Sequence, residues 1–414
     1  MRVQAIPAWL RTRANSEWLQ GNAITLLENG EAFFPALLEA IGAAQQEILL
    51  QTYIFAADAT GRRVADALAQ AAARGVSVRV LVDGFGGAAF VRELMTELNA
   101  AGVETLIFRP ESRFFSLHHQ RLRRLHRKVA VIDERIAFVG GINIIDDFDA
   151  AAPEHPRYDY AVRIEGPLLD PILISSRRLW RQVAWLSLRE HIRGSVMQTR
   201  FPPLPRKLER IKRQTTQPAA AGNMRATFLI RDNLRNRAGI ESAYLDAIAH
   251  AREEIVLANA YFFPGLRFRR ALLAAAARGV KITLLLQGVA DHPMMQYATR
   301  ALYPIFLENG IRLFEYQRSV LHAKVAVIDR HWATVGSSNI DPLSLMLARE
   351  ANVAVLDRKF AATLAASIST AMRDGAVELH REEWARQPIL RRLLCWLAYQ
   401  GVRLIAGIAG IKDD

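Results

Sequence analysis

The strongest constraint on this chain is an internal duplication of its sequence. Residues 126–133 read HRKVAVID, and residues 322–329 read HAKVAVID. Three further stretches recur in the same order: 39–55 with 246–262, 71–84 with 275–288, and 98–108 with 307–316. The copies stay about 200 residues apart throughout. We therefore interpret the chain as two halves built on a common plan.

Each half alternates helical and strand patterns. The alanine-rich stretch 61–75 has helical spacing and ends at Gly75, which can cap a helix. Short β-branched runs, such as 76–84 and the KVAVID segments, have the length of buried strands. We expect an α/β fold of two pseudo-symmetric halves, each with a mixed, mostly parallel sheet flanked by helices.

The segment between the halves has a different composition. Residues 200–223 are rich in proline, basic and polar residues and show no apolar period, which is typical of a linker. We assign residues 1–200 to the first half, 201–223 to the linker, 224–380 to the second half and 381–414 to a C-terminal tail.

The tail is apolar and has a basic flank. Residues 393–411 contain one charged residue, Arg403, and follow Arg391 and Arg392. This pattern predicts a membrane-associating helix that lies in the lipid interface. A helix packed on the body of the protein is an equal alternative.

Composition limits the class of partner. The formal net charge of +13 predicts an anionic partner: nucleic acid, an anionic lipid surface or a phosphate-bearing substrate. A single cysteine, Cys395, excludes an internal disulfide and a cysteine-rich zinc site, and its apolar surroundings predict a buried thiol. The first 22 residues lack the apolar core of a signal peptide, so we expect an intracellular protein.

The repeated phrase places chemically useful side chains at identical spacing in both halves. The first copy contains His126, Lys128, Asp133, Gly140, Gly141 and Asn143, and the second contains His322, Lys324, Asp329, Gly336, Ser337 and Asn339. A histidine and a lysine two residues apart on an extended strand point to the same face. The glycines permit a tight turn, where asparagine or serine can donate hydrogen bonds to an oxyanion.

This paired pattern resembles the phospholipase D superfamily from about residue 22 onward. The lead-in RLRRLHRK, the GGIN of the first copy and the GSSNIDPLSLMLAREANV of the second are similar to bacterial cardiolipin synthases, most of all to their B type. The resemblance implies one active site shared by the halves, which joins two phosphatidylglycerol molecules into cardiolipin and glycerol. It implies no metal and no other cofactor. Gly141 departs from the serine of many superfamily members, as in other cardiolipin synthases.

The resemblance also implies roles for the motif residues. Lys128 and Lys324 would neutralise the non-bridging phosphate oxygens. One imidazole would attack phosphorus, while the other protonates the leaving alkoxide and then deprotonates the incoming alcohol. The residues alone leave both assignments open, and the resemblance favours His126 as nucleophile and His322 as acid and base.

Four acidic residues complete the implied site. In related enzymes an acid bonds to the histidine of its own repeat, which implies that Asp159 orients His126 and Glu350 orients His322. Ordinary carboxylates at strand edges are the alternative. Asp133 and Asp329 enter the catalytic set as members of the motif, although the resemblance favours an anchoring role over proton transfer.

Three functions compete. A non-catalytic protein that binds anionic lipid or nucleic acid does not need two complete histidine–lysine sets. A phospholipase D or nuclease would use the same covalent intermediate as a transferase, but the flanking sequences and the apolar tail favour phosphatidyl transfer. We expect phosphatidylglycerol, an anionic phospholipid, as substrate and a peripheral position on the cytoplasmic face of a bacterial cell membrane. We predict neither nucleic acid nor another protein as partner.

Overall fold

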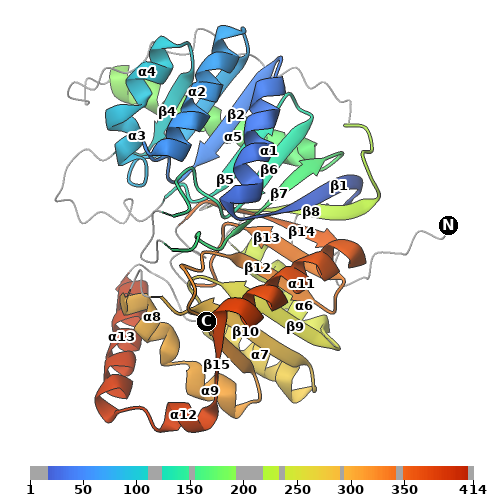
Figure 1. Cartoon of the computed structure of the whole chain (residues 1–414), viewed down its shortest axis with the longest axis vertical. Helices are drawn as coiled ribbons and strands as arrows, with labels where there is room; N and C mark the ends of the chain where they lie inside the picture. Colours follow the sequence, from blue (N-terminus) through green and yellow to red (C-terminus); the bar gives the residue numbers. More distant parts are fainter. Residues whose placement is uncertain are drawn as a thin grey trace.

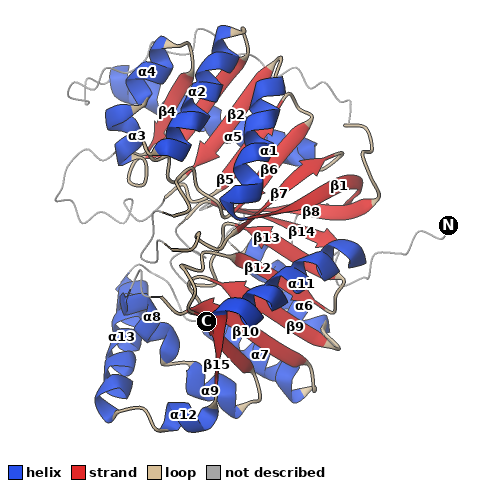
Figure 2. Ribbon diagram, in the orientation of Figure 1, coloured by secondary structure: helices blue, strands red, loops and turns tan. Residues whose placement is uncertain are grey.

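The computed structural model describes residues 17–110, 124–148, 154–192, 218–232, 238–289, 293–341 and 348–408. Two α/β halves lie one above the other in Figure 1 and are joined through a single sheet of 15 strands. Helices flank this sheet (Figure 2). The expected α/β fold of two related halves is confirmed.

The first half begins with alternating strands and helices and ends with antiparallel strands and a long helix. Its strands are β1 (Leu19–Glu28), β2 (Glu47–Thr52), β3 (Ser77–Asp83), β4 (Glu104–Phe108), β5 (Lys128–Ile132), β6 (Ile136–Gly140) and β7 (Tyr160–Glu165). Its helices are α1 (Asn29–Ala43), α2 (Ala59–Ala73), α3 (Ala88–Glu93), α4 (Met95–Ala100) and α5 (Leu169–Ile192). The helix predicted at 61–75 is α2, which Asp58 caps by accepting a 2.8 Å hydrogen bond from the Gly61 amide. Gly75 follows the helix at a φ of +90°, a conformation that suits glycine.

The second half repeats this order and then adds a short strand and two helices. Its strands are β8 (Met224–Arg231), β9 (Glu254–Asn259), β10 (Lys281–Gln287), β11 (Arg312–Tyr316), β12 (Lys324–Ile328), β13 (Trp332–Gly336), β14 (Glu350–Leu356) and β15 (Ala376–Leu379). Its helices are α6 (Gly239–His250), α7 (Leu266–Ala277), α8 (Pro293–Arg300), α9 (Tyr303–Glu308), α11 (Arg358–Gly375), α12 (Arg381–Ala385) and α13 (Ile389–Ile408). Residues 201–217 of the expected linker lie outside the described residues.

The strands run across the sheet in the order β15-β11-β10-β9-β12-β13-β14-β8-β1-β7-β6-β5-β2-β3-β4. Strands β1 and β8 pair at the centre, and equivalent strands follow on each side. Among the strands of the described residues, β2-β3-β4 and β9-β10-β11 pair in parallel. The strand pairs between β2 and β9, through the centre of the sheet, are antiparallel. The expected mixed sheet is confirmed, but the expectation that it is mostly parallel was wrong. Three-residue connections join β5 to β6 and β12 to β13, and such short links permit only antiparallel pairing.

One hydrophobic core spans both halves. Val139 and Val162 of the first half share a buried cluster with Val335 and Val353 of the second, and α5 and α11 contribute to it. The opposite face of each half has a cluster of its own, formed with α1 and α2 in the first half and with α6 and α7 in the second. The strands nearest the centre are therefore packed as one unit, and the histidine motifs lie among them.

The tail forms α12 and α13. Cys395 and Val402 of α13 are buried, which confirms the predicted buried thiol. The opposite side of α13 is exposed, so the helix is packed on the body and still presents an apolar face. Within the described parts of the chain, none of the helices combines the length and the hydropathy that a bilayer crossing requires.

Candidate active site

Both histidines lie just before a strand and are held there by the other half. The His126 amide donates a 3.0 Å hydrogen bond to the carbonyl of Arg349, and Leu125 forms a bridge with the same residue. In the second half, the His322 amide donates a 2.8 Å hydrogen bond to the carbonyl of Tyr158. Arg349 directly precedes Glu350, and Tyr158 directly precedes Asp159. The backbone of each histidine is thus bonded to the residue before the predicted acid of the other half.

The side chains follow the same crossed pattern. Nδ1 of His126 lies 2.9 Å from Oε1 of Glu350, and Nδ1 of His322 lies 2.6 Å from Oδ2 of Asp159. The structure brings all four predicted residues together, but the expected pairing within each repeat was wrong. Strands β7 and β14 lie on either side of the central β1–β8 pair. Asp159 precedes the first residue of β7 and Glu350 is the first residue of β14, so each acid contacts the histidine of the other half.

The two acids are supported differently. Glu350 is fully buried, and the Ser337 hydroxyl donates to its second oxygen while accepting a 3.0 Å hydrogen bond from the Ala351 amide. Ser337 therefore orients Glu350 rather than an oxyanion. Gly141 is the counterpart of Ser337, and a Cβ atom there would lie 2.3 Å from Oδ1 of Asp159. The carboxylate of Asp159 fills the space that a serine would need.

The lysines lie on the same side of the strands as their histidines, as predicted. Nζ of Lys128 donates a 2.8 Å hydrogen bond to the carbonyl of His126, and Nζ of Lys324 donates to the carbonyl of His322. Nζ of Lys324 also lies 3.9 Å from Oδ2 of Asp159.

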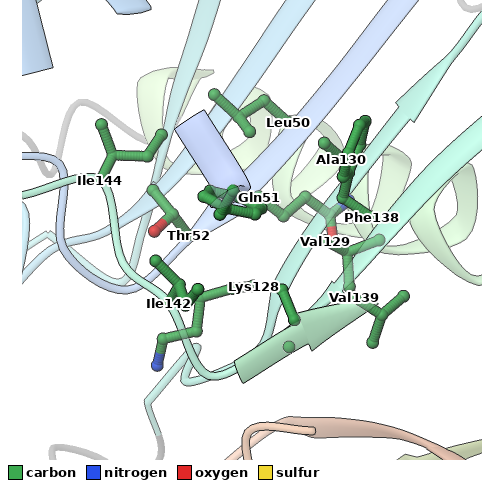
Figure 3. Close-up of a pocket in the computed structure, with 13 residues that line it drawn as sticks. Leu50, Gln51, Thr52, Lys128, Val129, Ala130, Phe138, Val139, Ile142 and Ile144 are labelled. Atoms are coloured by element: carbon green, nitrogen blue, oxygen red, sulfur yellow. The ribbon is translucent and has the colours of Figure 1, made fainter. Parts of the chain in front are cut away.

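Lys128 runs beside apolar side chains. In Figure 3 its amino nitrogen points away from Leu50, Ala130 and Phe138, which line a small pocket next to it. Burial, against the raising effect of Glu350 and with a smaller contribution from the positive charge of Lys324, lowers the pKa of Lys128 to about 7. A bound phosphate would favour the charged form of this lysine.

The ionisable groups of the two motifs influence one another's pKa values, so the two motifs form one electrostatic site. Burial lowers the pKa of His126, against the raising effect of Glu350, and it lowers the pKa of His322 well below the ordinary value, with Lys324 adding to the effect. Both imidazoles are therefore neutral at neutral pH. His126 itself lowers the pKa of His322, so the two motifs act on each other. Burial raises the pKa of Asp159 to about 6.

The motif aspartates are anchors. The carboxylate of Asp133 accepts hydrogen bonds of 2.7 to 2.9 Å from the backbone amides of residues 45–47. The carboxylate of Asp329 accepts bonds of 2.8 to 3.0 Å from the amides of residues 252–254. Each aspartate follows the last residue of its strand, β5 or β12, whereas each lysine is the first residue of that strand. The structure supports the anchoring role, and their inclusion in the catalytic set was wrong.

The two asparagines of the motif are buried and hold adjoining loops. Oδ1 of Asn143 accepts a 3.2 Å hydrogen bond from the Ile54 amide, and Oδ1 of Asn339 accepts a 3.4 Å bond from the Tyr261 amide. These bonds fix the segments that follow β2 and β9. They also set the orientation of each asparagine carboxamide.

Sequence reasoning missed Tyr53. The centroid of its ring lies 4.9 Å from that of the His126 ring, and Nζ of Lys128 lies 5.5 Å from the Tyr53 centroid. The second copy has Ala260 at the corresponding place. Comparison of the two copies therefore contained no signal for this aromatic residue.

Comparison with known proteins adds to this geometry. A family model described as "Cardiolipin synthase, PLD-like domain" matches residues 37–148 and 244–372, one segment in each half. Cardiolipin synthase B of Escherichia coli K12 is 43% identical over 357 residues, which cover 84% of this chain and 79% of that protein. Cardiolipin synthase A of Proteus mirabilis HI4320 is 30% identical over 392 residues, covering 92% and 75% respectively.

A solved structure shares the fold at low sequence identity. The phosphatidylserine synthase of Haemophilus influenzae Rd KW20 superposes with a TM-score of 0.68 at 14% identity, covering 96% of this chain and 98% of that one. The arrangement of two halves around one central region is therefore common to both proteins.

Proposed function

The chain belongs to the cardiolipin synthase family of phospholipase D-like enzymes, and we propose that it joins two phosphatidylglycerol molecules into cardiolipin and glycerol. The observation that carries this proposal is the crossed set of His126 with Glu350 and His322 with Asp159. Two neutral imidazoles, each oriented by an acid, provide one nucleophile and one proton carrier for a single phosphodiester.

The first step is attack by His126. Its Nδ1–H donates to Glu350, so Nε2 carries the lone pair that forms a bond to phosphorus. The bond from phosphorus to the headgroup glycerol oxygen breaks, and the phosphatidyl group remains on His126. Burial raises the pKa of Asp159 to about 6, so its carboxyl can hold a proton toward Nδ1 of His322. Neutral His322 then carries its own proton on Nε2, gives it to the departing oxygen and takes the proton of Asp159 at Nδ1, so the pair ends the step with one proton fewer.

The second step transfers the phosphatidyl group to a second lipid. A terminal glycerol hydroxyl of another phosphatidylglycerol gives its proton to His322 and attacks phosphorus. The phosphorus–nitrogen bond to His126 breaks, which releases cardiolipin and the free imidazole. Lys128 and Lys324 neutralise the non-bridging oxygens in both steps, and the Nδ2 groups of Asn143 and Asn339 are further donors.

The substrate is a lipid, so the site must work against a membrane. We place the enzyme at the cytoplasmic face of a bacterial cell membrane, where a net charge of +13 attracts anionic headgroups. Residues 1–200 and 224–380 serve as the two halves, 201–223 as their linker and 381–414 as the membrane-associating tail.

The test uses purified protein with phosphatidylglycerol vesicles and no added metal, with mass spectrometry of the products. We expect cardiolipin and glycerol in equal amounts, and no product from His126→Ala or His322→Ala. His250→Ala, a change at an exposed histidine of α6, is the matched control and leaves turnover unchanged. Phosphatidic acid alone would indicate a hydrolase, and cleavage of nucleic acid without lipid product would indicate a nuclease; either result overturns the proposal.

A further inference from the structure

Helix α13 carries a row of apolar side chains that is open to solvent. Leu390, Leu393, Leu397 and Leu404 recur at helical spacing and are 68%, 48%, 50% and 65% exposed. Further exposed side chains on this helix are Ile389, Leu394, Trp396 and Ile405. Scattered exposed leucines need no explanation, but so many exposed apolar side chains on one helix mark an interaction site.

The opposite side of α13 fixes the helix to the second half. Val402 is buried in the core formed with α6 and α7, Cys395 is also buried, and the Tyr399 ring lies 5.3 Å from that of Phe263. The helix packs along α8, as Figure 1 shows. The exposed face is therefore held in one orientation relative to the rest of the second half.

The charges on α13 are of one sign. The sequence from 389 to 408 contains three arginines and no aspartate or glutamate. Arg392 and Arg403 are eleven residues apart, which is about three helical turns, so they follow one edge of the apolar face. Arginine stems can lie on apolar surface while the guanidinium reaches phosphate, and a tryptophan such as Trp396 suits the same interface.

We infer that α13 is a fixed docking face for an anionic lipid bilayer, with its leucines at the acyl boundary and Arg392 and Arg403 at the headgroup phosphates. This inference deepens the proposed function and rests on it, because a lipid substrate makes the bilayer the surface that the enzyme must meet. Charge complementarity selects the anionic bilayer over a second copy, since two copies of this face would bring their arginines together.

The experiment measures co-sedimentation of the full chain with vesicles of phosphatidylcholine, with and without phosphatidylglycerol. Leu393→Glu combined with Leu397→Glu should lower the partition coefficient at least about tenfold for anionic vesicles. Arg392→Gln combined with Arg403→Gln should lower it by about tenfold for anionic vesicles and leave phosphatidylcholine binding unchanged. Ile174→Glu on α5 is the matched control, because Ile174 is 54% exposed, close to the 48% and 50% of Leu393 and Leu397.

A second measurement separates docking from catalysis. With short-chain phosphatidylglycerol below its micelle concentration, the leucine variant should keep wild-type turnover, whereas a folding defect would lower it. A wild-type protein that sediments with vesicles but makes no cardiolipin would refute the proposed function and leave docking supported. Unchanged vesicle binding by the leucine variant would overturn the inference. So would a leucine variant that binds vesicles normally but loses a dimer in sedimentation velocity, because the face would then join two copies.

Discussion

Glu350 begins a strand of the second half, yet its carboxylate lies 2.9 Å from Nδ1 of His126 in the first. The reciprocal contact, between Asp159 and His322, measures 2.6 Å. Neither half therefore contains an oriented histidine without the other. The two halves form one site, and each half supplies the acid that orients the histidine of the other half.

Replacing the charge that holds His126 should slow the reaction. Glu350→Gln keeps the shape of the side chain but removes its charge, so we expect kcat to fall by about 10²- to 10⁴-fold. Glu350 also raises the pKa of His126 against burial, so the acidic limb of the pH profile should move to lower pH. Steady-state kinetics from pH 4 to 9 measure both effects. Glu93→Gln, at an exposed ion pair, is the control; a kcat within about threefold of wild type would contradict the role of Glu350.

The pH profile of the wild type should have two limbs. Activity rises from the acidic side as the nucleophile His126 loses its proton, with a midpoint below 6.5 because burial lowers the pKa of His126. On the alkaline side, kcat/KM falls as pH rises through about 7, because Lys128 then loses the charge that attracts phosphate. Lys128→Arg, which stays charged, should remove the alkaline limb even if turnover is lower. Lys281→Arg is the exposed control, and an alkaline limb that persists in Lys128→Arg would assign it to another group.

The glycine that replaces serine in the first copy should not tolerate a side chain. A Cβ atom at Gly141 would lie 2.3 Å from Oδ1 of Asp159, so Gly141→Ala should displace this acid from His322 and lower kcat at least about tenfold. Gly42→Ala in α1, where no atom lies within 4 Å of the added carbon, should have wild-type kcat. Equal kcat for both variants would show that Asp159 does not need this position.

The motif aspartates should affect folding more than chemistry. Asp133→Ala removes the acceptor of three backbone hydrogen bonds, and we expect the free energy of unfolding to fall by about 1–3 kcal/mol. Urea denaturation followed by intrinsic fluorescence measures this loss. Turnover per folded molecule should stay near that of the wild type. A catalytic role would instead appear as lost turnover with unchanged stability.

Local patterns in the sequence were sufficient for much of the fold. Helix α2, its capping at Gly75 and the buried KVAVI strands follow from residue spacing, and comparison of the copies identified both histidine–lysine sets. The predicted proportion of parallel strands was wrong because strand and helix alternation stops after β4 in the first half. From there, three-residue turns set the antiparallel pairing of β5 with β6, as they do for β12 with β13.

The crossed acids could not be derived from spacing. Distance along the chain links Asp159 to His126, but the contact with His322 depends on how β7 and β14 meet around the central strands. Tyr53 gave no signal because its counterpart is Ala260. For α13, packing on the body is confirmed by the buried Cys395 and Val402, while membrane association stays a prediction.

In the proposed mechanism His126 carries the phosphatidyl group while His322 moves the proton. Phosphatidyl-p-nitrophenol separates these two roles, because nitrophenolate leaves without protonation. His322→Ala should release about one equivalent of nitrophenolate in a burst, and mass spectrometry of the quenched protein should find the phosphatidyl group on His126. His126→Ala should give neither burst nor adduct. A burst from His126→Ala with the adduct on His322 would contradict the assignment.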